Sequence, residues 1–298
     1  MPDAPAGRVL QPGQRCEVWV VDVAQGRSQR VFATHDLLLE APNWLAAADA
    51  LLLNGNGRLS RISLSDAQLH PVPIAGIPPI NNDHVLDPDG RHVYLSADDG
   101  HLYRAPLAGG TAIRISDADD LMHFLHGVDP AGTRLAFVGV PRRQAPGAAQ
   151  ALIHTMSSAG GDYRRLAHRH GAADGCEYSP DGRWLYFNVD AFDGRMQLAR
   201  MRPDASELAQ LTFDNCANWF PHLSPDGTRL VYLAFPPGTQ GHPSDVWVEI
   251  KLIDLPEWRP GKTLARVFGG QGTMNVNSWS PDGERFAYVA YPTAEMQA

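Results

Sequence analysis

The sequence predicts an all-β protein: a six-bladed β-propeller of four-stranded blades, built as a single domain over residues 1–298. The first supporting observation is a recurring turn. Ser-Pro-Asp-Gly begins at Ser179, Ser224 and Ser280, and looser copies begin at Asp87 and Asp129. Proline presets the first turn position, and Asp-Gly supplies the side-chain acceptor and positive backbone angle of a tight reversal. An alternating apolar segment follows each copy, so each copy marks a hairpin between two strands.

The second observation is the spacing of these turns. A degraded sixth copy lies at residues 43–53, where the turn residues are lost but the flanking apolar runs remain. With turns at 45, 87, 129, 179, 224 and 280, the intervals are 42, 42, 50, 45 and 56 residues. A period in the forties with room for four strands is typical of a propeller blade.

The third observation concerns the two ends of the chain. Arg15–Val23 and Ser28–Ala33 are two predicted strands that precede the first turn. Asn275–Trp279 and Arg285–Tyr291 are the first two predicted strands of a blade, after which the sequence ends. We therefore expect the N-terminal pair to complete the last blade, which closes the ring and removes an open sheet edge.

The blades between these ends follow in order. We expect them over residues 39–73, 81–115, 123–166 and 174–211, with the fifth starting at Asn218. Asn54-Gly55-Asn56-Gly57 predicts the middle hairpin of the first blade. The connections at 141–148 and 236–245 are longer than a hairpin requires, and surplus surface loops often carry recognition. No helical pattern is found.

Composition excludes several classes of partner. The net charge of −8 gives no basic footprint, so nucleic acid and anionic membranes are not expected partners. A small-molecule substrate is expected instead, or a protein partner if the chain is a scaffold. Cys16, Cys176 and Cys216 are an odd number without CxxC spacing, which favours a reducing compartment over a disulfide framework.

The N-terminus bears on the compartment as well. It has no basic patch followed by an apolar run, and no run of about 18 apolar residues occurs anywhere. A cytoplasmic location is therefore expected. A periplasmic chain whose leader had been removed would look the same.

Candidate functional residues lie in the segment before each turn, which forms the innermost strand and lines the central channel. His84, His126 and His222 fall in these segments in three different blades. Imidazole nitrogen with carboxylate or amide oxygen suits zinc, manganese, iron or nickel, and such a metal could activate water or polarise a substrate. The three histidines are therefore predicted to hold a divalent transition metal.

Carboxylates and amides occur in the same segments. Asp174 and Glu177 are predicted as metal ligands or as the catalytic base. A metal-free alternative uses one histidine as general base, oriented by Asp83, Asp174 or Glu177. The predicted substrate contacts are Asn82, Trp219, Gln271 and Asn275. The structural alternative is that these polar groups only hydrogen-bond buried water.

Three further features have mainly structural interpretations. Gly269–Thr273 lacks the Lys-Ser/Thr and the helix of a phosphate loop, so it predicts a flexible entry to the last blade that points Gln271 at the channel mouth. Cys176 is expected as a small buried hydrophobe, and 168–170 as a solvated turn. The tryptophans are expected to pack between blades rather than to stack on a sugar: Trp44, Trp219 and Trp279.

The Ser-Pro-Asp-Gly blades resemble those of the TolB-like propellers, over essentially the whole chain. Asn81–His84, Trp219–His222 and Phe268–Asn275 resemble signatures of an uncharacterised bacterial subgroup of single-domain, six-bladed proteins. The turn motif is specific for the fold and implies little about function. TolB itself has an extra N-terminal domain and a signal peptide that this sequence does not show.

The blade motif is also similar to that of oligogalacturonate lyases, which are intracellular and place a divalent metal on histidines and a glutamine near the propeller axis. By this resemblance His84, His126 and His222, with Gln271, would hold the ion. The resulting hypothesis is a metal-dependent lyase or hydrolase that acts in the channel on a small carbohydrate-like or anionic substrate. The alternative is a non-catalytic TolB-like propeller that binds a protein or a ligand.

Overall fold

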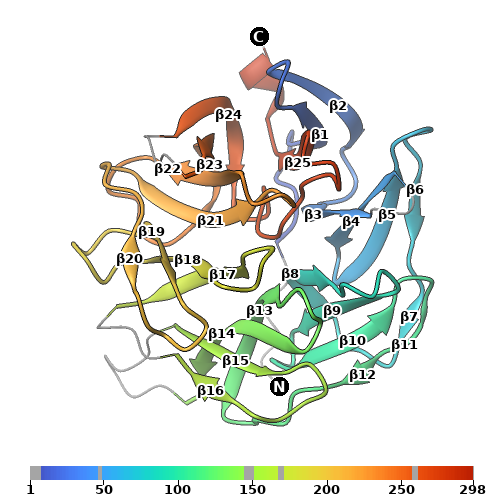
Figure 1. Cartoon of the computed structure of the whole chain (residues 1–298). Helices are drawn as coiled ribbons and strands as arrows, with labels where there is room; N and C mark the ends of the chain where they lie inside the picture. The colour runs from blue at the N-terminus through green and yellow to red at the C-terminus, as the bar shows by residue number, and fades with distance from the viewer. Residues whose placement is uncertain (1–7, 46–48, 144–150, 167–170, 257–260, 298) are drawn as a thin grey trace.

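The computed structural model describes residues 8–45, 49–143, 151–166, 171–256 and 261–297. Six sheets stand around a central axis, so the predicted six-bladed propeller is confirmed (Figure 1). Across these ranges every element is a strand except the short 3₁₀ helix η1 (Ala294–Gln297). None of the described helices has the length and apolar character needed to cross a membrane. The predicted turn at 168–170 lies outside the described residues.

Five blades are four-stranded sheets whose first strand lies nearest the axis (Figure 1). Blade one contains β3 (Glu40–Leu45), β4 (Ala50–Gly55), β5 (Arg58–Ser63) and β6 (Leu69–Pro71). Blade two contains β8 (Ile80–Leu86), β9 (His92–Ala97), β10 (Leu102–Pro106) and β12 (Ile113–Arg114). Blade three contains β13 (Leu121–Val128), β14 (Arg134–Pro141), β15 (Leu152–Ser157) and β16 (Arg164–Arg165).

Blade four contains β17 (Ala173–Tyr178), β18 (Leu185–Val189), β19 (Gln197–Met201) and β20 (Ala209–Gln210). Blade five contains β21 (Ala217–Leu223), β22 (Arg229–Phe235), β23 (Ser244–Asp254) and β24 (Lys262–Gly270). A short parallel pair, β7 (Ile74–Ala75) with β11 (Gly110–Thr111), joins the outer parts of blades one and two.

Blade six closes the ring as predicted. β1 (Cys16–Asp22) lies between β2 (Arg27–Thr34) and β25 (Arg285–Ala290), and both pairings are antiparallel. The two ends of the chain therefore share one sheet, in which β1 is the central strand. Pairing with β1 removes the open edge that β25 would otherwise have on that side.

One predicted strand of blade six is wrong. Residues 275–279 do not form a strand. Trp279 makes a single bridge to Phe286, and Ser278 bonds to Ala287 through its carbonyl oxygen and its hydroxyl. Asn277 instead donates to Glu177 Oε1 at 2.7 Å in blade four and to Leu223 O at 2.9 Å in blade five. The segment thus also ties neighbouring blades together.

The apolar core lies between successive blades. Trp219 and Trp279 belong to one buried cluster that joins blades five and six, and Trp44 belongs to the next, which joins blades six and one. The tryptophans therefore pack between blades, as the sequence predicts. Cys176 is fully buried in the cluster of blade four, and burial raises the pKa of its thiol well above the ordinary value, as befits an inert core residue.

The inner strands share one irregularity that prepares the functional site. In β3, β8, β13, β17 and β21 the pairing register shifts near the middle of the strand, which leaves extra residues outside the ladder. Bulges of this kind bend a strand and re-aim its side chains, and they often lie next to active sites. The bulges span Asn81–Asp83 in blade two, His126 in blade three, and Phe220–Pro221 in blade five.

Candidate functional site

A cavity of about 350 Å³ opens at the end of the channel where the inner strands begin. Its wall combines polar and apolar residues. The polar part consists of Asn81, Asn82, Asp83, His126, Asp174, His242, Gln271 and Asn275. The apolar part consists of Phe124, Val138, Val140, Ala151 and Phe220. Five of the predicted site residues therefore meet here: His126, Asp174, Asn82, Gln271 and Asn275.

His126 is the centre of the polar part of the wall. Its Nε2 lies 2.9 Å from Asp174 Oδ1 and 4.0 Å from Asp83 Oδ1, and its side chain is 3% exposed. The contact between His126 Nε2 and Asp174 is an ion pair in the wall of the cavity. Burial acts to lower the pKa of His126, but the charges of Asp83 and Asp174 outweigh it and raise the pKa to about 9.

The two carboxylates are driven in opposite directions. Burial raises the pKa of Asp83 to about 6, although the nearby His126 acts against the rise. Burial also acts to raise the pKa of Asp174, but contacts with His126 and His242 hold it well below the usual range. Near neutrality, Asp83 can therefore exchange a proton while Asp174 stays ionised. Carboxyl groups separated in this way are typical of acid–base sites.

His242 is a site residue that sequence reasoning missed. It comes from the loop before β23, and its Nε2 lies 3.5 Å from Asp174 Oδ2. Its ring meets Trp219 edge-on, with 4.4 Å between ring centroids. Trp219, a predicted substrate contact, thus supports His242 from behind and does not line the cavity. The signal in the sequence was the surplus length of residues 236–245.

An amide chain forms the rest of the polar part of the wall. Gln271 Nε2 donates to Asn82 Oδ1 at 3.3 Å, and Asn275 Nδ2 donates to Gln271 Oε1 at 3.0 Å. Gly270 has φ of +91°, and a Cβ there would lie 2.1 Å from the carbonyl oxygen of Pro243. Residue 270 must therefore be glycine. It belongs to the segment Gly269–Thr273, called the Gln271 segment below, which packs here against the loop that carries His242.

Arg8 stabilises the Gln271 segment. Its guanidinium donates to the carbonyl oxygen of Gln271 at 2.6 Å and to Asp245 Oδ1 at 2.8 Å, and it lies 4.1 Å above the ring of Tyr291. The Gln271 segment is thus held by several contacts, not a flexible entry to the blade.

The predicted metal triad is not brought together. His84 is fully buried, and its Nδ1 donates to Asn43 Oδ1 at 2.7 Å because the Asn43 amide nitrogen itself donates to a carbonyl. Burial lowers the pKa of His84 to about 3, so the ring is neutral. His222 contacts Glu177 Oε2 at 2.7 Å through Nδ1 and the carbonyl oxygen of Met274 at 3.0 Å through Nε2. Neither nitrogen of His222 is free to bind a metal.

Another group has the spacing of metal ligands. Throughout the described part of the chain, only Asp87, Asp89 and His92 bring three such atoms within 4.8 Å of one another. They lie on blade two, away from the channel mouth. Arg104 already bridges this group, since it contacts Asp87 Oδ2 at 2.8 Å and Asp89 Oδ2 at 2.7 Å.

Glu177, predicted as a catalytic base, is a structural link. Its Oε1 accepts from the backbone N–H of Leu223 at 3.1 Å and from Asn277, and its Oε2 contacts His222. It lines a second cavity of about 300 Å³ at the opposite end of the channel. His126 lines both cavities, so it lies between them.

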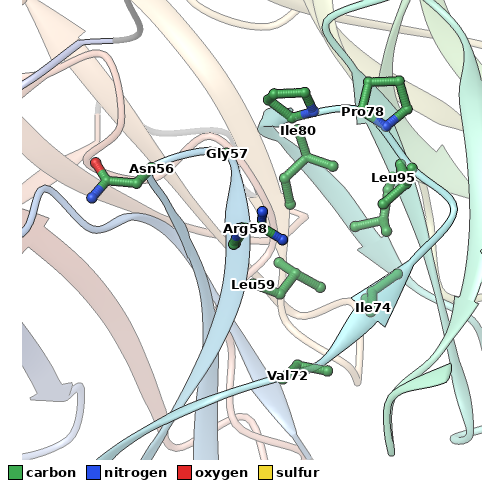
Figure 2. A pocket seen from close by; sticks show the side chains of 11 residues that line it. Asn56, Gly57, Arg58, Leu59, Val72, Ile74, Pro78, Ile80 and Leu95 are labelled. Atoms are coloured by element: carbon green, nitrogen blue, oxygen red, sulfur yellow. The ribbon is translucent and has the colours of Figure 1, made fainter.

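A smaller cavity of about 110 Å³ lies between blades one and two (Figure 2). Figure 2 shows Leu59, Val72, Ile74, Ile80 and Leu95 around it. Its wall contains no carboxylate or imidazole, so it offers no acid–base chemistry. The channel mouth is the better candidate site.

No family model matches the chain. An uncharacterised protein of Agrobacterium fabrum (strain C58) is 38% identical over 271 residues, which is 89% of each chain. The solved structure of a TolB candidate from Agrobacterium tumefaciens is 35% identical with a TM-score of 0.86, covering 94% of this chain and 99% of that one.

More distant structures share the fold alone. An oligogalacturonate lyase in complex with manganese has a TM-score of 0.60 at 13% identity, covering 89% of this chain and 75% of that one. The recurring turn, the six-bladed ring and the two Agrobacterium relatives agree, and the chain belongs to the TolB-like six-bladed β-propeller proteins.

Proposed function

We propose that the channel-mouth cavity is the active site of an enzyme that cleaves a carbon–oxygen bond of a small hydroxylated molecule by acid–base catalysis, as a hydrolase or a lyase. The observation that carries the proposal is the contact of one buried imidazole, His126, with two carboxylates, the partly buried Asp174 and the buried Asp83, in the wall of a cavity. A cluster of perturbed ionisable groups in a cavity favours a functional role over a structural one.

The protonation states suit two complementary roles. Asp83, with a pKa of about 6, is ionised near neutrality and serves as the base. His126, with a pKa of about 9, is protonated at the same pH and serves as the acid. Asp174 keeps the proton on His126 and orients the ring. It is a positioning residue.

The same pair of proton transfers serves both reaction types. In hydrolysis Asp83 takes a proton from water as the water oxygen bonds to carbon, and His126 protonates the departing oxygen as the old carbon–oxygen bond breaks. In elimination Asp83 takes the proton from the adjacent carbon, a carbon–carbon double bond forms, and His126 again protonates the departing oxygen. Exchange with solvent then returns a proton from Asp83 to His126.

A metal is not part of this mechanism. A distant fold neighbour binds manganese, but the predicted ligands do not fit one here, because His222 has no free nitrogen and His84 lines neither channel cavity. A cation beside Asp83 and Asp174 would have to displace the proton of His126.

Turnover of chromogenic glycosides and acylated sugars tests the proposal with Asp83→Asn and His126→Gln. Each variant is expected to lose at least about a hundred-fold in kcat/KM, the usual contribution of an acid or base. Asp193→Asn and His92→Gln are matched controls outside the cavity and should keep wild-type turnover. Full turnover in both site variants would overturn the proposal. A wild-type chain that binds these compounds without cleaving them would favour the non-catalytic scaffold.

A further inference from the structure

Resting on the proposed function, we infer that the ring bound in the channel mouth is a neutral sugar, not a sugar acid or an amino sugar. The charge of the cavity wall is the first reason. Within the described chain no lysine or arginine lines the cavity. Its charged groups are the carboxylates of Asp83 and Asp174, and they face the imidazoles of His126 and His242. The wall thus pairs its carboxylates with its own imidazoles and offers a ligand no unpaired cation.

A carboxylate on the ligand would be repelled in this site. Asp83 and Asp174 would both be its neighbours, and the imidazoles that could compensate, His126 and His242, already contact Asp174 at 2.9 Å and 3.5 Å. Arg8 contacts the cavity residue Gln271 through its carbonyl oxygen, and its guanidinium also contacts Asp245 and the ring of Tyr291. An ammonium group would meet the cationic ring of His126 instead.

The wall offers the two kinds of surface that a sugar ring uses. Phe124 and Phe220 offer aromatic surface for its C–H groups, and the amides of Asn82, Gln271 and Asn275 offer polar groups for its hydroxyls. Phe220 is held at φ of +55°, a conformation that costs energy for an aromatic residue and that recurs at functional sites. Its backbone N–H donates to Asn188 Oδ1 at 3.1 Å, which holds the ring in place.

The amides explain how hydroxyl groups would be recognised. Asn82, Gln271 and Asn275 bond to one another in a chain, which fixes the direction of each donor and acceptor. A fixed array of this kind binds hydroxyls, which both donate and accept, and rejects analogues that leave its buried groups unpaired. The cavity of about 350 Å³ is at the small end of ligand sites, so we expect it to hold a single ring.

A neutral ring also selects between the two reaction types. Elimination removes a proton from carbon, and this proton is acidic enough only beside a carboxylate or similar group. A neutral sugar lacks that group. Hydrolysis by Asp83 and His126 is then the expected reaction.

The experiment compares sugars that differ in one substituent. Glucose, glucuronate and glucosamine, and galactose, galacturonate and galactosamine, are titrated at pH 7.5 against the whole chain by ligand-observed NMR. A neutral member of one trio should bind at least about ten-fold more tightly than its acid and its amine. Gln271→Ala and Phe124→Ala should each weaken that binding several-fold, whereas Gln240→Ala, outside the cavity, should not. Asp83→Asn should reduce the difference in affinity between the neutral sugar and the sugar acid, because it removes a negative charge that repels the acid.

The outcomes separate this inference from the proposed function. Tighter binding of an acid or an amine would overturn the inference, and so would no binding of any of the six. Neither result would contradict the proposed function, which is tested separately by the loss of turnover in Asp83→Asn and His126→Gln.

Discussion

His126 Nε2 lies 2.9 Å from Asp174 Oδ1, and this ion pair joins blades three and four across the channel mouth. Asp83 of blade two reaches the same nitrogen at 4.0 Å. Three neighbouring blades thus each contribute one ionisable group to one point. The bulges of the inner strands make this convergence possible.

Activity is expected to depend on pH with two limbs. It should rise through about pH 6 as Asp83 ionises and fall through about pH 9 as His126 loses its proton. The pH profile of kcat/KM measures both. Asp174→Asn should move the upper limb toward neutrality by removing the charge that holds the His126 proton. An upper limb that stays in place in this variant would contradict the role of Asp174.

Stability should also respond to His126. Its folded pKa of about 9 lies above its ordinary value of 6.5, so the stabilisation is complete below about pH 6.5 and is lost as pH rises through 9. The free energy of unfolding should fall by roughly 2–3 kcal/mol between pH 6.5 and 9.5. Urea denaturation at both values measures it. In His126→Gln the free energy of unfolding should fall clearly less over this pH range than in the wild type. Equal falls in the variant and the wild type would show that titration of His126 does not affect stability.

Gly270→Ala should damage the site through the loop that carries His242. The new Cβ would lie 2.1 Å from Pro243 O, at a φ of +91° that already disfavours a side chain. A loss of about 1–3 kcal/mol in stability is expected, together with weaker ligand binding. Gly238→Ala is the matched control, because it has a similar φ of +83° with no atom within 4 Å. Equal ligand binding by the two variants would show that the contact with Pro243 does not matter.

Glu177→Gln should behave as a structural variant. Glu177 links His222, Leu223 and Asn277, so its replacement should lower the free energy of unfolding by about 1–3 kcal/mol. The pH limbs of activity should stay where they are. A variant of wild-type stability whose turnover is abolished would instead make Glu177 catalytic.

Elemental analysis of the purified chain tests the metal-free mechanism. We expect a substoichiometric content of zinc, manganese, iron and nickel, and turnover that survives thorough chelation. A near-stoichiometric metal content in the wild type that is lost in His126→Gln and Asp174→Asn would contradict this mechanism. It would favour a metal-dependent site in the channel instead.

The fold followed from local features that a sequence displays directly. The Ser-Pro-Asp-Gly turns set the blades, and the strands at Cys16–Asp22 and Arg285–Ala290 set the closure. The convergence of His126 and Asp174 was likewise predictable, because both precede a turn. The direction in which each neighbouring side chain points was not predictable, since a bulge breaks the alternation of side chains along a strand. His84 and His222 therefore turned away from the mouth.

His242 could not be placed by periodicity at all. It lies in a loop whose course is set by contacts with Trp219 and with the Gln271 segment, both of which are distant in sequence. Asp83 shows a related limit. Its role depends on burial beside His126, and no sequence pattern reports the burial of one carboxyl group.

The most direct test of the central claim is the protonation state of His126, measured by NMR of ¹⁵N-histidine-labelled protein and assigned with His126→Gln. We predict that both ring nitrogens of His126 carry a proton at pH 7.5 and that one proton is lost near pH 9. In Asp174→Asn the loss should occur at lower pH. A neutral His126 at pH 7.5 in the wild-type chain would contradict the acid–base site proposed for the channel mouth.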